Sequence, residues 1–385
     1  MNRTTAVVIV TLVAILAVVG LLTGKRSSNQ EQPGTAAEPS IAGIARRIER
    51  VRQLRFDHLP RVRHVTGAQA RADGLREFDR EVTAREVAVE ERLLKLLGLL
   101  PDRASLRELT GKALASEVGG FYDPRTGRLA IVGGTPSGLL GEITLAHELT
   151  HALEDQRFGL DLPNPTSFNR DRAAATSALQ EGTATIAMVD YAVLKEAGTA
   201  KVPASVREQA LKALANAAVP ASSGLPRYVR DGLVFPYAAG ARLVNRIQGR
   251  GGWNAVNRAI EAGGPISTEQ VMHPAKYDAH EQPVRVRVAA PNGADLIERG
   301  DFGEFDTREL LLAANGPARA AGAAAGWGGG GFALWRGGLR VRWVWDSAGD
   351  ARDFAQALRR TAQRLGGATV DSSDKGIELL LSSRG

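Results

Sequence analysis

The chain contains no cysteine among its 385 residues. Disulfide bridges, thiolate metal ligands and a cysteine nucleophile are therefore all excluded. Any metal site formed by this protein has to use histidine, aspartate or glutamate side chains. The absence of cysteine fits an oxidising and a reducing compartment equally well, so it does not decide where the protein is located.

Aromatic residues are also scarce, at 5% of the sequence, and only eight of the 49 basic residues are lysine. The net charge of +7 therefore comes from arginine, and this excess could favour acidic partners, anionic lipid headgroups or nucleic acid. We favour a solvated arginine-rich surface and expect no nucleic-acid partner, because the sequence has no dense basic run. Nucleotide binding is not supported, because the glycine run 328–331 lacks the Lys-Ser/Thr of a phosphate loop.

Hydrophobic residues make up 44% of the sequence and charged residues 24%, which is typical of a globular protein with a substantial core. The length indicates two or three domains. We divide the chain into an N-terminal transmembrane anchor or signal (1–26), a flexible linker (27–39), a main domain (40–312), an Ala/Gly-rich linker (313–331) and a small α+β unit (332–385).

The segment 6–22 is an uncharged run of 17 residues in which only Thr11 is polar. This length is at the short limit for a membrane-spanning helix, and no clear cleavage site follows it directly. We expect an uncleaved membrane anchor with an extracytoplasmic soluble domain, and secretion after signal cleavage is the alternative. Basic residues flank the run on both sides, at Arg3, Lys25 and Arg26, and leave its orientation ambiguous.

Local signals predict several elements of the main domain. Ser40 is a typical N-cap for a helix whose apolar residues recur at three- and four-residue steps. Thr83 and Glu86 form a capping-box pattern before another helix. The segment 119–134 is typical of a β-hairpin with its turn at 123–127, and it precedes the helix that carries the motif described next.

The most informative stretch is His147-Glu148-Leu149-Thr150-His151, an H-E-x-x-H motif. On a helix, residues four apart lie on one face about one turn apart, so the two imidazoles can point at one metal ion. The glutamate lies near the rim of that face, where it can reach a metal-bound water without binding the metal.

Two histidines are not enough, because a catalytic zinc usually has three protein ligands and one open position. The extended motif with a third histidine is excluded, since Arg157 stands at that position. Glu181 follows His151 by thirty residues, in a long helix expected over 171–194. A loop and a returning helix would bring this carboxylate over the motif.

The two sequence segments HELTHALEDQ and LQEGTA together resemble those of the gluzincin type of zinc metallopeptidase. The resemblance covers residues 119–194, about a fifth of the chain. The resemblance implies a mainly helical, zincin-like domain of the α+β class with a small edge β-sheet that pairs with an extended substrate backbone. It also implies that His147, His151 and Glu181 are Zn²⁺ ligands and that Glu148 is the general base.

This chain departs from the gluzincin pattern at one position. Many gluzincins have an acidic residue four positions after the ligand glutamate, and it orients a histidine. Thr185 stands there in this sequence. Asp155 or Asp190 could take over the role of an outer carboxylate that orients a metal ligand.

The function expected from these residues is hydrolysis of peptide bonds in a protein or peptide substrate. Zinc lowers the pKa of its bound water towards about 7, Glu148 accepts a proton as the water attacks, and Glu148 then returns it to the leaving amine. Two alternatives remain, namely a non-enzymatic binding or assembly protein on a peptidase fold and a zinc hydrolase of a non-peptide bond.

An oxyanion stabiliser is also needed, and Tyr237, His273 and Tyr277 are the candidates. The segment 267–277 reads as a loop that closes over the metal and presents His273 or Tyr277, and an ordered connector is the alternative. For Tyr237, at the start of a helix, simple packing is the alternative.

Overall fold

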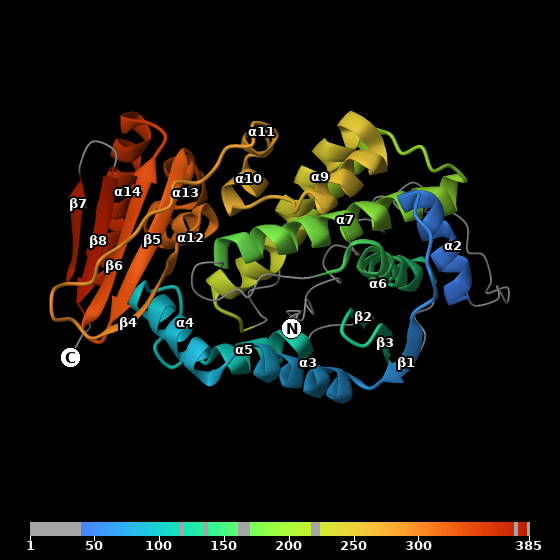
Figure 1. The fold of residues 1–385 in the computed structure, drawn as a ribbon, viewed down its shortest axis with the longest axis horizontal. Helices are drawn as coiled ribbons and strands as arrows, with labels where there is room; N and C mark the ends of the chain where they lie inside the picture. Colours follow the sequence, from blue (N-terminus) through green and yellow to red (C-terminus); the bar gives the residue numbers. More distant parts are fainter. Residues whose placement is uncertain are drawn as a thin grey trace, which may run out of the picture.

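The computed structural model describes residues 40–115, 119–133, 138–160, 170–216, 224–372 and 376–382. The expected membrane anchor at 6–22 and the linker at 27–39 lie outside these residues. Within the described chain, none of the helices combines the length and the apolar character of a membrane span. The described residues form a helical body and two separate β-sheets, which confirms the α+β class (Figure 1).

Helix α7 (Arg170–Ala197) runs through the middle of the helical body (Figure 1). Every side chain from Glu181 to Leu194 is buried, so the helix is enclosed by its neighbours rather than packed on one face. The low polarity of the Ala-rich sequence fits this position. The helices that pack against it include α2 (Ile41–Arg52), α6 (Gly138–Phe158), α8 (Ala204–Asn216) and α9 (Arg227–Glu261).

Helices α7 and α9 approach each other backbone to backbone at a pair of glycines. A Cβ atom at Gly240 would lie 1.8 Å from the carbonyl oxygen of Ala178. A Cβ atom at Gly182 would lie 2.3 Å from the carbonyl carbon of Gly240. Gly182, which follows Glu181, is therefore required by packing. The contact also fixes where Tyr237 on α9 lies along the helix axis relative to Glu181 on α7.

Replacing Gly240 with Ala is expected to lower the free energy of unfolding by about 1–3 kcal/mol, because the new methyl group forces the two backbones apart. Gly232→Ala is a matched control on the same helix, since nothing lies within 4 Å of its Cβ position. Alanine there should be neutral or slightly stabilising, because it is the better helix former. Urea unfolding of both variants measures the difference, and an equal response would contradict the close approach.

The smaller sheet lies beside α6 and contains the expected hairpin. Strand β3 is central, β1 pairs with it in parallel and β2 pairs with it in antiparallel fashion, which leaves β2 at an edge of this sheet. Tyr122 is opposite Leu129 in the hairpin register. The strands are β1 (Arg61–Val65), β2 (Gly120–Asp123) and β3 (Arg128–Val132), and the nearby helices are α3 (Gly67–Glu81), α4 (Ala84–Leu96) and α5 (Leu106–Ala115).

The C-terminal part is an antiparallel sheet of five strands with order β4-β5-β6-β8-β7. Two short helices, α10 (Thr268–Met272) and α11 (Pro274–Asp278), precede it in the chain. The elements of the sheet unit are β4 (Leu296–Asp301), α12 (Glu304–Asn315), α13 (Pro317–Ala324), β5 (Trp327–Trp335), β6 (Gly338–Trp345), α14 (Ala348–Leu365), β7 (Ala368–Ser372) and β8 (Gly376–Ser382).

The prediction of an Ala/Gly-rich linker at 313–331 is wrong. These residues form the end of α12, the whole of α13 and the first half of β5, which is buried throughout. The glycines are needed because other backbone segments touch β5: Cβ atoms at Gly329 and Gly331 would lie 2.2 and 2.5 Å from the carbonyl oxygens of Val284 and Val286. The C-terminal unit therefore starts at β4, before the expected boundary at 332.

Candidate metal centre

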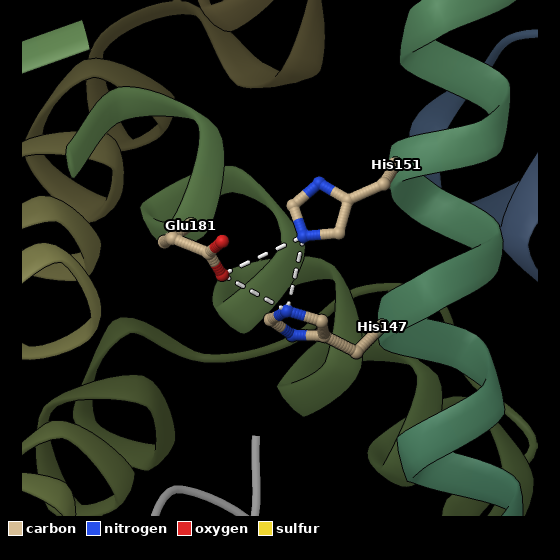
Figure 2. Close-up of side chains that lie close together, drawn as sticks. All are labelled: His147, His151 and Glu181. Carbon is tan, nitrogen blue, oxygen red and sulfur yellow. Dashed lines mark hydrogen bonds and ion pairs between the residues drawn. The ribbon is translucent and has the colours of Figure 1, made fainter. Parts of the chain in front are cut away.

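Two helices bring the predicted ligands together. His147 and His151 lie one turn apart on α6, and their imidazoles point toward the carboxylate of Glu181 on α7 (Figure 2). The Nε2 atom of His147 lies 3.1 Å from Glu181 Oε2 and 3.1 Å from the Nε2 atom of His151. The distance from His151 Nε2 to Glu181 Oε2 is 3.5 Å. Three donor atoms thus converge on one small volume.

This cluster is buried and electrostatically coupled. Burial alone would raise the pKa of Glu181, but positive charge on His151 and hydrogen bonds with both imidazoles lower it to about 2. Burial alone would lower the pKa of His151, but the Glu181 carboxylate raises it to about 9. The carboxylate is therefore held in its charged form and attracts positive charge into the space between the three side chains.

The donor set fits a divalent metal ion. Two imidazole nitrogens and one carboxylate oxygen are ligands that zinc takes in proteins, and the ligand atoms lie within 4.8 Å of one another. Within the described chain, the buried Glu181 Oε1 atom has no hydrogen-bond partner, which leaves it available to a group not present in the protein itself.

A second group of acidic side chains has a different character. Glu269, Glu281 and Asp346 also lie close enough together to hold an ion. The ammonium group of Lys276 forms ion pairs with all three carboxylates. Because a side-chain cation already pairs with every carboxylate of this group, it is a salt-bridge cluster and we do not regard it as a metal centre.

Glu148 lies beside the ligand cluster and contacts the edge strand. Its Oε2 atom accepts a hydrogen bond of 2.9 Å from the backbone N–H of Tyr122. Burial raises the pKa of Glu148, and the neighbouring imidazoles act in the opposite direction. A carboxyl group with a raised pKa near a metal-binding cluster is suited to accept and return a proton.

Of the three candidates for an oxyanion stabiliser, Tyr237 is the one with a ring contact to a predicted ligand side chain within the described residues. Its ring is stacked on that of His147, with ring centroids 5.9 Å apart and an angle of 24° between the planes. Among the described residues, His273 and Tyr277 form no hydrogen bond, ion pair or ring contact with His147, His151 or Glu181. Their role as oxyanion stabilisers, which would be exerted on the substrate rather than on these three side chains, stays a prediction.

The segment 267–277 consists mainly of the short helices α10 and α11, and buried carboxylates hold it in place. His273 Nε2 lies 2.7 Å from Glu304 Oε1 on α12. Asp171, at the start of α7, accepts hydrogen bonds from the backbone N–H and the hydroxyl group of Thr268. The segment is thus an ordered junction between α7 and the C-terminal unit, which was the alternative interpretation.

Neither aspartate expected to orient a ligand histidine does so. Asp155 accepts hydrogen bonds from the Tyr122 hydroxyl group at 2.8 Å and from the Leu160 N–H at 3.1 Å. Both oxygens of Asp190 are bound by Arg207, at 2.7 and 2.8 Å. The expectation that Asp155 or Asp190 replaces the missing acid at Thr185 is therefore wrong, since these carboxylates are engaged with other groups.

A family model described as a domain of unknown function (DUF8575) matches residues 293–379. This range starts just before β4 and ends within β8, so it corresponds to the C-terminal sheet unit and excludes the helices that carry His147, His151 and Glu181. No curated protein matches the chain in a sequence comparison, and no solved structure matches it.

Proposed function

We propose that this chain is a zinc metallopeptidase of the gluzincin type with a zincin-like domain. The observation that carries the proposal is the convergence of His147 Nε2, His151 Nε2 and Glu181 Oε2 in a buried position. Glu148 lies next to this cluster and is bound to an edge strand, as expected of a general base close to a bound peptide.

In this proposal His147, His151 and Glu181 hold zinc, which supplies a Lewis acid and lowers the pKa of water. Glu148 accepts a proton from the attacking water and transfers it to the leaving amine. Tyr237, whose ring stacks on that of His147, is a candidate for stabilising negative charge on the carbonyl oxygen, beside His273 and Tyr277. Strand β2, at an edge of the smaller sheet in the described part of the chain, would offer backbone groups other than the Tyr122 N–H to an extended substrate.

We further propose that the run at 6–22 anchors the protein in a membrane and that the described part is extracytoplasmic. The support for this is the length and the uncharged composition of that run. Its substrates would then be proteins or peptides outside the cytoplasm. Cleavage of the run as a signal would give a secreted enzyme with the same site.

Metal removal tests the proposed function. The detergent-solubilised full chain, loaded with zinc, is expected to cleave fluorescently labelled unfolded casein. Treatment with 1,10-phenanthroline should abolish cleavage, and addition of zinc after removal of the chelator should restore it, because the three side chains remain in place. Cleavage that persists in the chelated protein, or no cleavage by the zinc-loaded protein, would contradict the proposal.

A further inference from the structure

Tyr122 connects the edge strand to the motif helix through two hydrogen bonds. Its backbone N–H donates to Glu148 at 2.9 Å, and its hydroxyl group donates to Asp155 at 2.8 Å. Glu148 and Asp155 are seven residues apart on α6, which places them two turns apart on one face of the helix. A single residue of β2 therefore contacts the helix at two points, one of which is the proposed general base.

The bond to Glu148 is buried, and the bond to Asp155 is partly buried. Tyr122 and Glu148 are buried. Burial, together with the charge of Asp155, raises the pKa of the Tyr122 hydroxyl group, which therefore stays protonated and acts as a donor. Asp155 is itself fixed by the N–H of Leu160 just beyond the end of α6, so the phenol is bound to a rigid acceptor.

The geometry couples the side chain of Tyr122 to the orientation of Glu148. The backbone N–H of Tyr122 holds one oxygen of the carboxylate and restricts rotation of that group. The position of this N–H depends on where β2 lies relative to α6, and the phenol bond to Asp155 fixes that position at a second point. On the other side of the strand, Phe121 packs into a separate apolar cluster with Val65, Leu114 and Ala130.

We propose that Tyr122, through its hydrogen bond to Asp155, is a positioning residue that sets the Glu148 carboxylate for proton transfer. This inference rests on the proposed peptidase function, and it adds a residue that the H-E-x-x-H motif does not contain. Asp155 belongs to the same unit, since it is the acceptor on α6. Loss of either partner should release β2 and allow the carboxylate to rotate.

The chain supplies a matched control for this inference. Tyr191, on α7, is also buried and donates its hydroxyl hydrogen to a carboxylate of α6, that of Glu142, at 2.7 Å. This bond has the same chemistry and joins α6 to a neighbouring element, but it does not involve the edge strand or Glu148. A purely structural role for Tyr122 would therefore give the same results as the control.

The test compares Tyr122→Phe, Asp155→Asn and the double variant with Tyr191→Phe, all as zinc-loaded full chains with labelled casein as substrate. Tyr122→Phe should lower kcat about tenfold or more with little change in KM or zinc content, because slight misplacement of a catalytic group is costly. In Asp155→Asn and in the double variant, kcat should fall by no more than it does in Tyr122→Phe. Tyr191→Phe should lower the melting temperature and keep kcat within about twofold.

Amide hydrogen exchange in fragments that cover β2 provides a readout independent of activity. Exchange at residue 122 should become about tenfold faster or more in Tyr122→Phe than in Tyr191→Phe, because a hydrogen bond to a charged group is lost nearby. Unchanged exchange, or a kcat in Tyr122→Phe equal to that of Tyr191→Phe, would overturn the positioning role. If the parent protein cleaves nothing, the peptidase proposal fails, and hydrogen exchange alone then decides whether the phenol clamps β2.

Discussion

Glu148→Gln is expected to abolish peptide-bond hydrolysis while the protein still binds about one zinc ion per chain. The amide has the shape of the carboxylate, and its oxygen can still accept the hydrogen bond from the N–H of Tyr122. It cannot take up a proton from water, so kcat/KM should fall by about 10²- to 10⁴-fold, the range for loss of a general base. Casein cleavage and elemental analysis of the same sample measure both quantities.

Glu196→Gln is the control for this substitution, because Glu196 is exposed near the end of α7. It makes the same chemical change on a helix of the site and should leave both cleavage and zinc content unaltered. If the Glu148→Gln protein cleaved casein as fast as the parent, the assignment of Glu148 as the general base would be wrong. Loss of zinc in this variant would instead make the residue a ligand.

Glu181→Ala is expected to remove zinc from the protein. The remaining imidazoles of His147 and His151 supply two ligands, and a catalytic zinc requires three. Loss of an outer-shell partner already costs about 10–100-fold in metal affinity, so loss of a ligand should cost more than about 100-fold. Competition with a fluorescent zinc chelator measures the affinity of the parent and of the variant.

Asp346→Ala is the matched control, because Asp346 belongs to the second acidic group, in which Lys276 already pairs with the carboxylates. Its zinc affinity should equal that of the parent. An unchanged affinity in Glu181→Ala would refute the gluzincin-type site. A loss of affinity in Asp346→Ala would show that zinc binds at the salt-bridge cluster.

The core of the site was predictable because its information is local. The spacing of His147 and His151 is that of one helical turn. The sequence around the motif and around Glu181 is specific enough to suggest which helix supplies the third ligand. What the sequence could not show is why a glycine follows Glu181. That reason is the backbone of α9 at Gly240, which only folding brings into contact.

Contacts between residues far apart in the chain could not be predicted. His273 was proposed as an oxyanion stabiliser because the segment 267–277 was interpreted as a loop over the metal. The hydrogen-bond partner of His273 is Glu304, which lies 31 residues further along the chain. No local sequence pattern predicts that contact. Tyr122 was overlooked as a functional residue for the same reason, although its place in the hairpin before the motif was predicted correctly.

Two errors in the fold have a similar physical origin. An Ala/Gly-rich composition is shared by flexible linkers and by strands that neighbouring backbones approach closely, and β5 is of the second kind. Helix α3 was not predicted. Its only buried residue is Gly74, and Ala70 and Leu75, which pack against an apolar cluster, are only partly buried. The capping box formed by Thr66 and Gln69 was a local signal that could have revealed it.

The central claim is that His147, His151 and Glu181 hold zinc. Anomalous diffraction from a zinc-loaded crystal, recorded on both sides of the zinc absorption edge, tests this claim directly. We predict an anomalous peak bounded by the Nε2 atoms of both histidines and by the Glu181 carboxylate, with ligand distances of about 2.0–2.2 Å. A crystal with no anomalous peak between these three side chains, or with zinc bound only at other residues, would contradict the proposed metal centre.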